Sequence, residues 1–319
     1  MVGKGPCPPD RMPAQLTRRQ CLSLLAVSSL TLGRTADAAP EGDPAPDTKP
    51  PDELDVQDLE LEGGRRMPRR ARVFVPKARR PDERFPLLVL LHGLAETESE
   101  AVGVRAWSER YGLLAADRRL RRPPVVRERP GRYLSDERLA KINSKLADRP
   151  FRGFVVVCPY TPNVYKEAST AAAVDRYAAW IKGTLLPAVR AATPVRTDTA
   201  ATAIDGCSLG GYVALEVFLR APEEFGAVGG VQTAIGETPA LLSAVRLRQA
   251  IDRAGPRAIH IESSVWDPSL KVHELWSARL KELGVPHELD VLPGGHDQTF
   301  LREVGTLEML LWHDQRMPV

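Results

Sequence analysis

Two uninterrupted apolar runs, at residues 87–91 (LLVLL) and 154–158 (FVVVC), restrict the fold more than any other feature of this sequence. A strand made only of apolar residues must be covered by protein on both faces, as in parallel sheets with helices on each side. The strand-like runs of the chain lie at 54–61, 70–76, 86–92, 153–159, 200–206, 226–235, 257–264 and 287–292.

Helical patterns alternate with the later strands. Apolar residues recur at helical spacing over residues 171–189, 211–220, 241–251, 272–283 and 300–312. Strand–helix alternation of this kind is typical of an α/β fold. We therefore expect one α/β domain over residues 54–319, with a mostly parallel sheet and helices on both faces.

One connection in this domain is unusually long. Residues 95–152 separate two central strands, and they contain a stretch (WSERYGLLAADRRL) that predicts a helix, followed by a proline-broken, arginine-rich segment. Long connections in compact domains are often functional and frequently border a site. We expect an insertion that lines the entrance of a site, with a purely structural addition as the alternative.

The N-terminus has the features of an export signal. A twin arginine, Arg18–Arg19, precedes 12 uncharged residues (21–32), and Ala36-Asp37-Ala38 follows as a cleavage site. Paired arginines are typical of the Tat pathway, and 12 residues are fewer than the ~20 needed to span a bilayer. We expect residues 1–38 to be a Tat-like signal and the protein to be periplasmic or extracellular, with an uncleaved amphipathic N-terminus as the alternative.

Removal of that leader changes the charge and cysteine content. The whole chain of 319 residues has a net charge of +3, but without residues 1–38 its acidic and basic side chains are equal in number. This balance gives no support to a nucleic-acid partner. Residues 39–53 are rich in proline and acid and predict a disordered spacer. Only Cys158 and Cys207 remain, in apolar runs typical of free, buried thiols.

The segment Gly206-Cys207-Ser208-Leu209-Gly210 matches the pattern G-x-S-x-G. The pentapeptide alone is weak evidence, but a strand (ATAID) enters it and a helix (YVALEVFLR) leaves it, as a nucleophile elbow requires. Glycines on either side of the serine avoid clashes in the tight turn. The hydroxyl would lie beside the helix N-terminus, where developing negative charge is favoured. Ser208 is therefore the candidate nucleophile.

Of the six histidines, His296 is the candidate base that would take the proton of Ser208. It follows a strand and Pro293-Gly294-Gly295, in a loop at the carboxyl edge of the sheet, where such folds bind ligands. The other histidines lie in strand or helix patterns or at their ends, and we expect structural or exposed roles for them.

Asp267 is the candidate acid that would orient His296. It stands after the strand at 257–264 and between the nucleophile and the histidine, which is the chain order Ser–acid–His. An ordinary turn residue is the alternative, because Asp-Pro is itself a turn signal. Asp297 is better placed to cap the last helix, and Glu262 lies within a strand.

The oxyanion-binding groups are expected from the backbone. His92-Gly93-Leu94 ends a central strand, so the N–H groups of Leu94 and Leu209 would converge on a substrate oxygen. His92 itself is expected to be structural.

Together these segments resemble the α/β-hydrolase superfamily, and within it the putative-esterase (esterase D-like) group of secreted carboxylesterases. The resemblance rests on LLVLLHGL, WIKGTLLPAV, AIDGCSLGGYVAL, RAPEEFGAVGG and LPGGHDQTF, and it covers residues 54–315 except 95–152. It implies an eight-stranded sheet with an antiparallel second strand, and a catalytic triad of Ser208, Asp267 and His296.

The expected activity is therefore hydrolysis of a carboxylic ester through an acyl-enzyme on Ser208. The sequence has no Walker loop, no H-E-x-x-H and no EF-hand pattern, so no cofactor or metal is expected. The expected partner is a small or polymeric ester, with no nucleic acid and with membrane contact only during export. An acyltransferase or peptidase on the same triad, and a non-catalytic binding protein with the same fold, remain alternatives. The sequence leaves acyl and alcohol specificity and the oligomeric state open.

Overall fold

The computed structural model describes residues 53–62, 67–77, 80–127 and 133–318. The predicted export signal and the predicted spacer, except its last residue Glu53, lie outside the described residues. The strands are β1 (Leu54–Glu60), β2 (Arg70–Pro76), β3 (Leu87–Leu91), β4 (Val155–Pro159), β5 (Thr202–Gly206), β6 (Ala227–Val231), β7 (Ala258–Trp266) and β8 (Glu288–Gly295). Each of the eight predicted strands is present.

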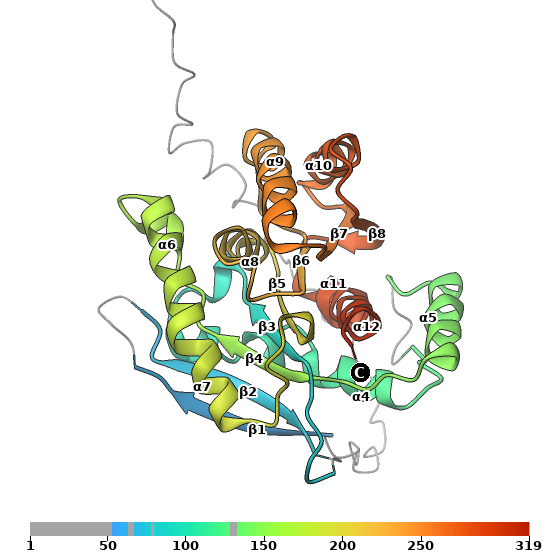
Figure 1. The fold of residues 1–319 in the computed structure, drawn as a ribbon. Helices are drawn as coiled ribbons and strands as arrows, with labels where there is room; N and C mark the ends of the chain where they lie inside the picture. The colour runs from blue at the N-terminus through green and yellow to red at the C-terminus, as the bar shows by residue number, and fades with distance from the viewer. Residues whose placement is uncertain (1–52, 63–66, 78–79, 128–132, 319) are drawn as a thin grey trace, which may run out of the picture. The chain divides into compact units, whose positions relative to one another are not determined.

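The strands form one eight-stranded sheet in the order β1-β2-β4-β3-β5-β6-β7-β8 (Figure 1). β2 is antiparallel to both of its neighbours, whereas the pairs from β4 through β8 are parallel. The mostly parallel sheet and its antiparallel second strand are therefore as predicted. Parallel strands direct their carboxyl ends to one edge, which is where α/β sheets place their ligands.

Short helices and one longer helix form the connection between β3 and β4. They are η1 (Leu94–Glu96), α2 (Glu100–Gly103), α3 (Ala106–Glu109), α4 (Leu113–Arg121) and α5 (Asp136–Asp148). The single helix predicted over WSERYGLLAADRRL is wrong in one respect, because the chain breaks at Gly112, whose φ of 78° lies in the left-handed region. The prediction also missed α5, which begins after Ser135, whose hydroxyl accepts a hydrogen bond from the Arg138 amide.

The remaining helices include each of the five predicted over residues 171–189, 211–220, 241–251, 272–283 and 300–312, and two short ones, η2 and η4, that were not predicted. They are η2 (Val164–Lys166), α6 (Thr170–Trp180), η3 (Ile181–Leu185), α7 (Leu186–Ala192), η4 (Thr199–Ala201), α8 (Leu209–Arg220), α9 (Glu237–Ala254), α10 (Leu270–Glu282), α11 (Gln298–Phe300), η5 (Leu301–Gly305) and α12 (Thr306–Arg316). η3 and η5 are π-helical turns that join their neighbours into longer helices. Within the described ranges, no helix has the length and apolar content that crossing a membrane requires.

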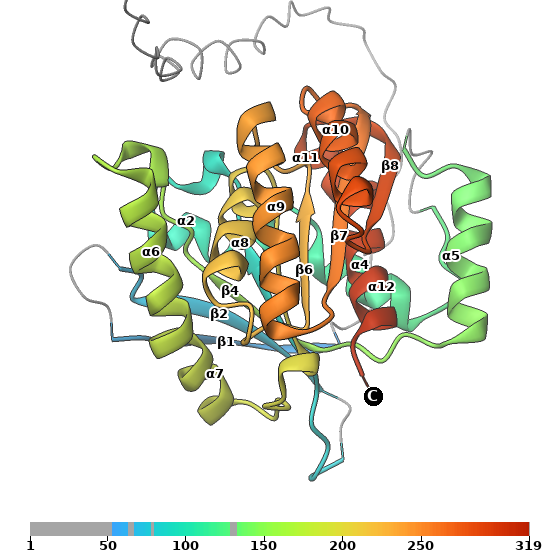
Figure 2. The ribbon, with the colours of Figure 1, turned by 45° about the horizontal axis from the view of Figure 1, so that its top comes forward.

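Two apolar cores lie on opposite faces of the sheet. Residues of α6 through α10 pack against one face, and residues of α3, α4, α5 and α12 pack against the other. Figure 2 shows α6, α8 and α9 in front of the strands. All five residues of β3 are fully buried, because alternate side chains enter the two cores. This burial explains why the strand is apolar throughout.

Both cysteines of the described residues are buried and free. Cys158 lies in β4, and Cys207 follows β5 directly. Burial raises the pKa of both thiols, so neither has the character of a reactive thiolate.

Candidate active site

The turn between β5 and α8 holds Ser208 in a strained conformation. Its φ of 54° and ψ of −116° place a non-glycine residue outside the usual regions. The turn has no room for side chains around it. A Cβ on Gly206 would lie 2.5 Å from the Gly210 carbonyl carbon, and a Cβ on Gly210 would lie 2.2 Å from the Leu91 oxygen. Because these two residues have no Cβ, the backbone of the elbow packs directly against the end of β3.

The structure brings the three predicted side chains together. His296 Nε2 lies 3.0 Å from Ser208 Oγ, and His296 Nδ1 lies 3.2 Å from Asp267 Oδ1. Ser208 follows β5, Asp267 follows β7, and His296 follows β8, so all three stand at the carboxyl ends of parallel strands. This arrangement connects nucleophile, base and acid by hydrogen bonds.

The side chain of Asp267 is buried and held in place by hydrogen bonds. Its side chain is fully buried, while one third of the His296 side chain is exposed. The Ser269 amide donates to Asp267 Oδ1 at 2.9 Å, and the Ser263 hydroxyl donates to Oδ2 at 3.0 Å. Burial by itself would raise the pKa of Asp267, but hydrogen bonds from His296 and Ser269 outweigh it, so the pKa lies below its usual value. The carboxylate is therefore charged at neutral pH, as an orienting acid must be.

The two backbone groups predicted to bind an oxyanion lie on adjacent strand ends. Leu91 of β3 pairs with Gly206 of β5, and the Cys207 amide donates to the Leu91 carbonyl at 3.1 Å. Leu94 and Leu209 each follow that pair by three residues, and each is the first residue of a helix, η1 and α8. The first N–H groups of a helix have no partner within it, so both amides are suited to donate a hydrogen bond to an external oxygen.

A buried cluster that sequence reasoning missed supports the loop carrying Leu94. The Gly93 amide donates to the Tyr111 hydroxyl at 3.2 Å, and that hydroxyl donates to the buried carboxylate of Glu96. Gln298, two residues after His296, donates to the same carboxylate at 3.3 Å. Burial raises the pKa of Tyr111, which keeps the phenol protonated as a donor. No motif marked this cluster, because its members are far apart in the sequence.

The 95–152 connection reaches the triad through an aromatic contact. Trp266 precedes Asp267, is 68% exposed and pairs with Gly295 beside His296. The ring of Tyr133 packs edge-on against the Trp266 ring, at 6.1 Å between centroids. Tyr111 of the same connection contacts Gly93, as described above. These contacts place residues of the connection beside Trp266 and Gly93, and the role of the connection at the entrance of a site stays a prediction.

The remaining histidines have structural partners. His92 is buried between the Gly93 carbonyl and the Thr161 amide, as expected. His313 bonds to Asp205 at 2.8 Å, and His260 stacks on Trp312. Each is buried and packed within the fold.

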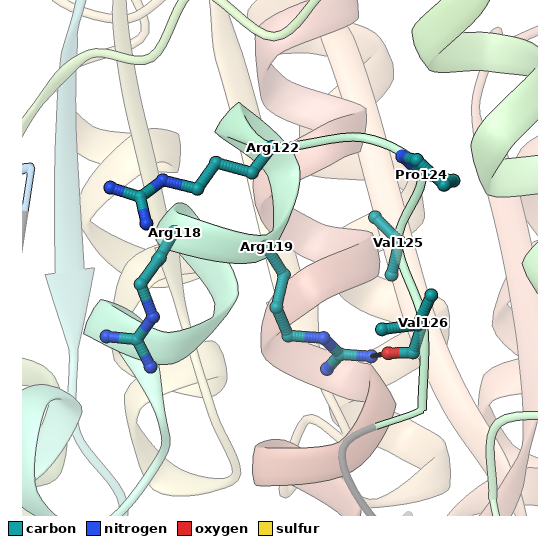
Figure 3. Close-up of a pocket in the computed structure, with 6 residues that line it drawn as sticks. All are labelled: Arg118, Arg119, Arg122, Pro124, Val125 and Val126. Carbon is teal, nitrogen blue, oxygen red and sulfur yellow. Dashed lines mark hydrogen bonds between the residues drawn. The ribbon is translucent and has the colours of Figure 1, made fainter. Parts of the chain in front are cut away.

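One hollow lies apart from these residues, on the 95–152 connection. It has a volume of about 150 Å³ and is lined by Arg118, Arg119, Arg122 and residues 124–126 (Figure 3). Arg119 spans it and donates to the Val126 carbonyl at 3.1 Å. None of the three triad residues lines this hollow, so it is not part of the candidate active site.

Fold and site together define the class: the chain has the α/β-hydrolase fold. Solved structures with this fold include a ferulic acid esterase, which is 19% identical with a TM-score of 0.58, covering 83% of this chain and 98% of that one. S-formylglutathione hydrolase from Staphylococcus aureus is 14% identical with a TM-score of 0.56, over 83% and 98% of the two chains. Ferric enterobactin esterase from Salmonella typhimurium is 20% identical with a TM-score of 0.51, over 82% and 58%.

The predicted resemblance to the putative-esterase group is also confirmed. The family model described as “Putative esterase” matches residues 152–281, a segment that contains Ser208 and Asp267 and ends before His296. The comparisons thus show a distant likeness to esterases and serine hydrolases. A search of curated proteins gives no significant match.

Proposed function

We propose that this protein is an exported serine hydrolase that cleaves carboxylic esters. The observation that carries the proposal is the continuous hydrogen-bonded chain from Ser208 through His296 to the charged Asp267. The match to the “Putative esterase” model and the likeness to named esterases support the reaction class. The twin arginine of the leader supports export.

In the proposed mechanism, His296 takes the hydroxyl proton of Ser208 as the serine oxygen attacks the ester carbonyl. Asp267 accepts the Nδ1–H of His296, which leaves Nε2 free to act as the base, and its charge stabilises the imidazolium. The amides of Leu94 and Leu209 bind the oxyanion of the tetrahedral intermediate. His296 then protonates the departing alcohol. In the second half of the reaction His296 takes a proton from water, the water oxygen attacks the acyl carbonyl, and His296 returns the proton to Ser208 as the free acid leaves.

The strained turn and the exposed base fit this role. Ser208 is the N-cap of α8, a helix of 12 residues, so its hydroxyl lies where the helix dipole favours negative charge. One third of the His296 side chain is exposed, which gives a substrate and the hydrolytic water access to Nε2.

A panel of aryl esters of increasing acyl length tests the proposal. The wild-type protein is expected to hydrolyse at least one of them, and Ser208→Ala is expected to lose that activity while keeping its melting temperature. Labelling with a fluorophosphonate probe gives an independent measurement, because an activated serine reacts and an inactive scaffold does not. A folded wild-type protein that neither reacts with the probe nor turns over any ester would refute the proposal.

Added alcohol or amine acceptors separate hydrolysis from acyl transfer. If the acyl group is recovered mainly on the acceptor rather than as free acid, the protein is a transferase on the same residues. Cleavage of peptides in preference to esters would instead indicate a peptidase.

A further inference from the structure

Both oxygens of the Asp267 carboxylate are held in place. Oδ1 faces His296 and the Ser269 amide, whereas Oδ2 accepts its hydrogen bond from the Ser263 hydroxyl at 3.0 Å. A fully buried carboxylate obtains no compensating hydrogen bonds from bulk water. The Ser263 hydroxyl therefore sets the rotation of the carboxylate plane, which in turn decides how Oδ1 meets His296.

The Ser263 oxygen is itself held by His273 of α10. His273 Nδ1 lies 2.9 Å from Ser263 Oγ, and His273 Nε2 lies 2.8 Å from the Thr233 carbonyl oxygen. Ser263 and His273 are both fully buried. A carbonyl can only accept, so Nε2 must carry a proton, and Nδ1 of a neutral ring is then an acceptor.

The protons in this network are too few for every contact when His273 is neutral. The single hydroxyl proton of Ser263 then faces two acceptors, His273 Nδ1 and Asp267 Oδ2. Burial lowers the pKa of His273, and a proton on His296 acts in the same direction, whereas the Thr233 carbonyl and Asp267 oppose them. The charged carboxylate is the stronger acceptor, so Ser263 donates to Asp267. The unprotonated Nδ1 of His273 then lies against the Ser263 oxygen, where the ring limits the movement of the hydroxyl by contact and not by a hydrogen bond.

The far end of this network returns to the nucleophile. The Ser208 amide donates to the carbonyl of Val231, the last residue of β6, at 2.9 Å, and the Ala234 amide of the loop that follows β6 donates to the Ser208 carbonyl at 3.0 Å. Thr233, the anchor of His273, lies in the same loop. The backbone from Val231 to Ala234 is thus hydrogen-bonded both to Ser208 of the elbow and to His273, which contacts Ser263 beside Asp267.

We propose that Ser263 and His273 are positioning residues for the triad acid, a proposal that rests on the function proposed above. They act through Asp267, by holding its carboxylate in the orientation that aligns His296 with Ser208. Loss of the pair should therefore slow the chemical step and leave substrate binding unchanged.

A second serine–histidine pair in the molecule provides a matched control. Ser277 Oγ lies 2.7 Å from His287 Nε2, and His287 Nδ1 lies 2.9 Å from the Val285 carbonyl oxygen. Ser277 is buried like Ser263. Its partner His287 forms no hydrogen bond to a triad residue in the described part of the chain. Replacement of Ser277 therefore changes stability without changing the contacts of Asp267.

The first experiment compares Ser263→Ala with Ser277→Ala on an aryl ester whose turnover depends on Ser208. Ser263→Ala is expected to lower kcat roughly tenfold or more, the order expected for one buried acceptor left unpaired. Its KM should stay within about twofold of wild type, because the lost interaction does not bind substrate. Ser277→Ala should keep the wild-type kcat, and melting temperatures measured in parallel report on folding.

The second experiment compares His273→Asn with His273→Gln. The asparagine amide takes the place of Nδ1 and keeps a polar group against the Ser263 oxygen, whereas the glutamine amide reaches the place of Nε2 and leaves no polar group beside Ser263. His273→Asn is therefore expected to keep a higher kcat than His273→Gln. If Ser263→Ala does not fold, this pair of variants decides the question.

Equal kcat values for Ser263→Ala and Ser277→Ala, or for the two His273 variants, would overturn the positioning role. That result differs from failure of the proposed function. In the latter case the wild-type protein itself shows no hydrolysis that depends on Ser208.

Discussion

Replacement of Asp267 by asparagine removes the charge from the proposed triad and little else. The asparagine oxygen can stay toward His296 and Ser269, and its amide can donate to the Ser263 oxygen in place of accepting from it. All the hydrogen bonds around the side chain can therefore be kept. We expect Asp267→Asn to fold with a melting temperature close to that of wild type.

The loss of activity follows from the distance between the two charges. Asp267 Oδ1 lies 3.2 Å from His296 Nδ1, and a unit charge at that distance stabilises an imidazolium by about 5 kcal/mol at an effective dielectric constant of about 20. His296 is one-third exposed, so solvent screens part of this energy. The expected fall in kcat is about 10³- to 10⁴-fold.

Asp297 provides the control, because it lies next to His296 but has a different role. Its carboxylate accepts from the Phe300 amide at 2.8 Å and caps the helix that begins with α11, as the sequence predicted. Asp297→Ala should lower the free energy of unfolding by about 1 kcal/mol and leave kcat within a few-fold of wild type. Steady-state kinetics and thermal melting of both variants are the assay. A well-folded Asp267→Asn protein with near-wild-type kcat would refute the assignment of Asp267.

Four further outcomes are expected. Gly210→Ala should lower the free energy of unfolding by about 1–3 kcal/mol or more, because the new Cβ would meet the Leu91 carbonyl. Gly183→Ala should not lower it, because a Cβ at Gly183 would have no atom within 4 Å, and urea unfolding of the two variants is the measurement. Glu262 is fully buried, and burial and the neighbouring carboxylates raise its pKa. The unfolded chain releases the proton of Glu262 as the pH rises above 4.5, whereas the folded state keeps it, so the free energy of unfolding falls as the pH rises. Glu262→Gln should therefore melt above wild type at about pH 8 but not at about pH 4, and an equal gain at both would contradict the buried neutral acid. Trp266→Ala should raise KM for esters with ring-containing groups more than for acetyl esters, since its exposed ring adjoins the site; equal effects on both exclude that role. Lysines at Arg18 and Arg19 should leave the precursor in the cytoplasm, and unchanged secretion on cell fractionation would remove the Tat assignment.

The sheet could be predicted from sequence because its constraint is local. Strands β3 and β4 are buried on both faces, and a segment in that position is apolar at every residue. The elbow was equally visible, since a strand, a glycine-flanked serine and a helix follow one another without interruption. Ser208 was therefore identified from its immediate neighbours.

Asp267 and His296 were predicted less directly. Chain order and their positions after strands selected them, since the ends of parallel strands share one edge of the sheet. Their distances to one another, and the burial that leaves Asp267 charged, are visible only after β7 and β8 pair in register. The break in the helix at Gly112 and the helix α5, which the sequence did not predict, both lie in the connection between β3 and β4.

By itself the sequence determined the strands of the sheet and the elbow, because each depends on patterns spanning a few neighbouring residues, and chain order then selected Asp267 and His296 as candidates. Only the tertiary structure brings Ser263 and His273 to the carboxylate of Asp267, and Tyr111 and Glu96 to the loop that carries Leu94. The physical reason is that a buried hydrogen bond depends on atoms from segments distant in the chain. Serine, histidine, tyrosine and glutamate occur in many local settings, and only packing shows which polar atom must satisfy which.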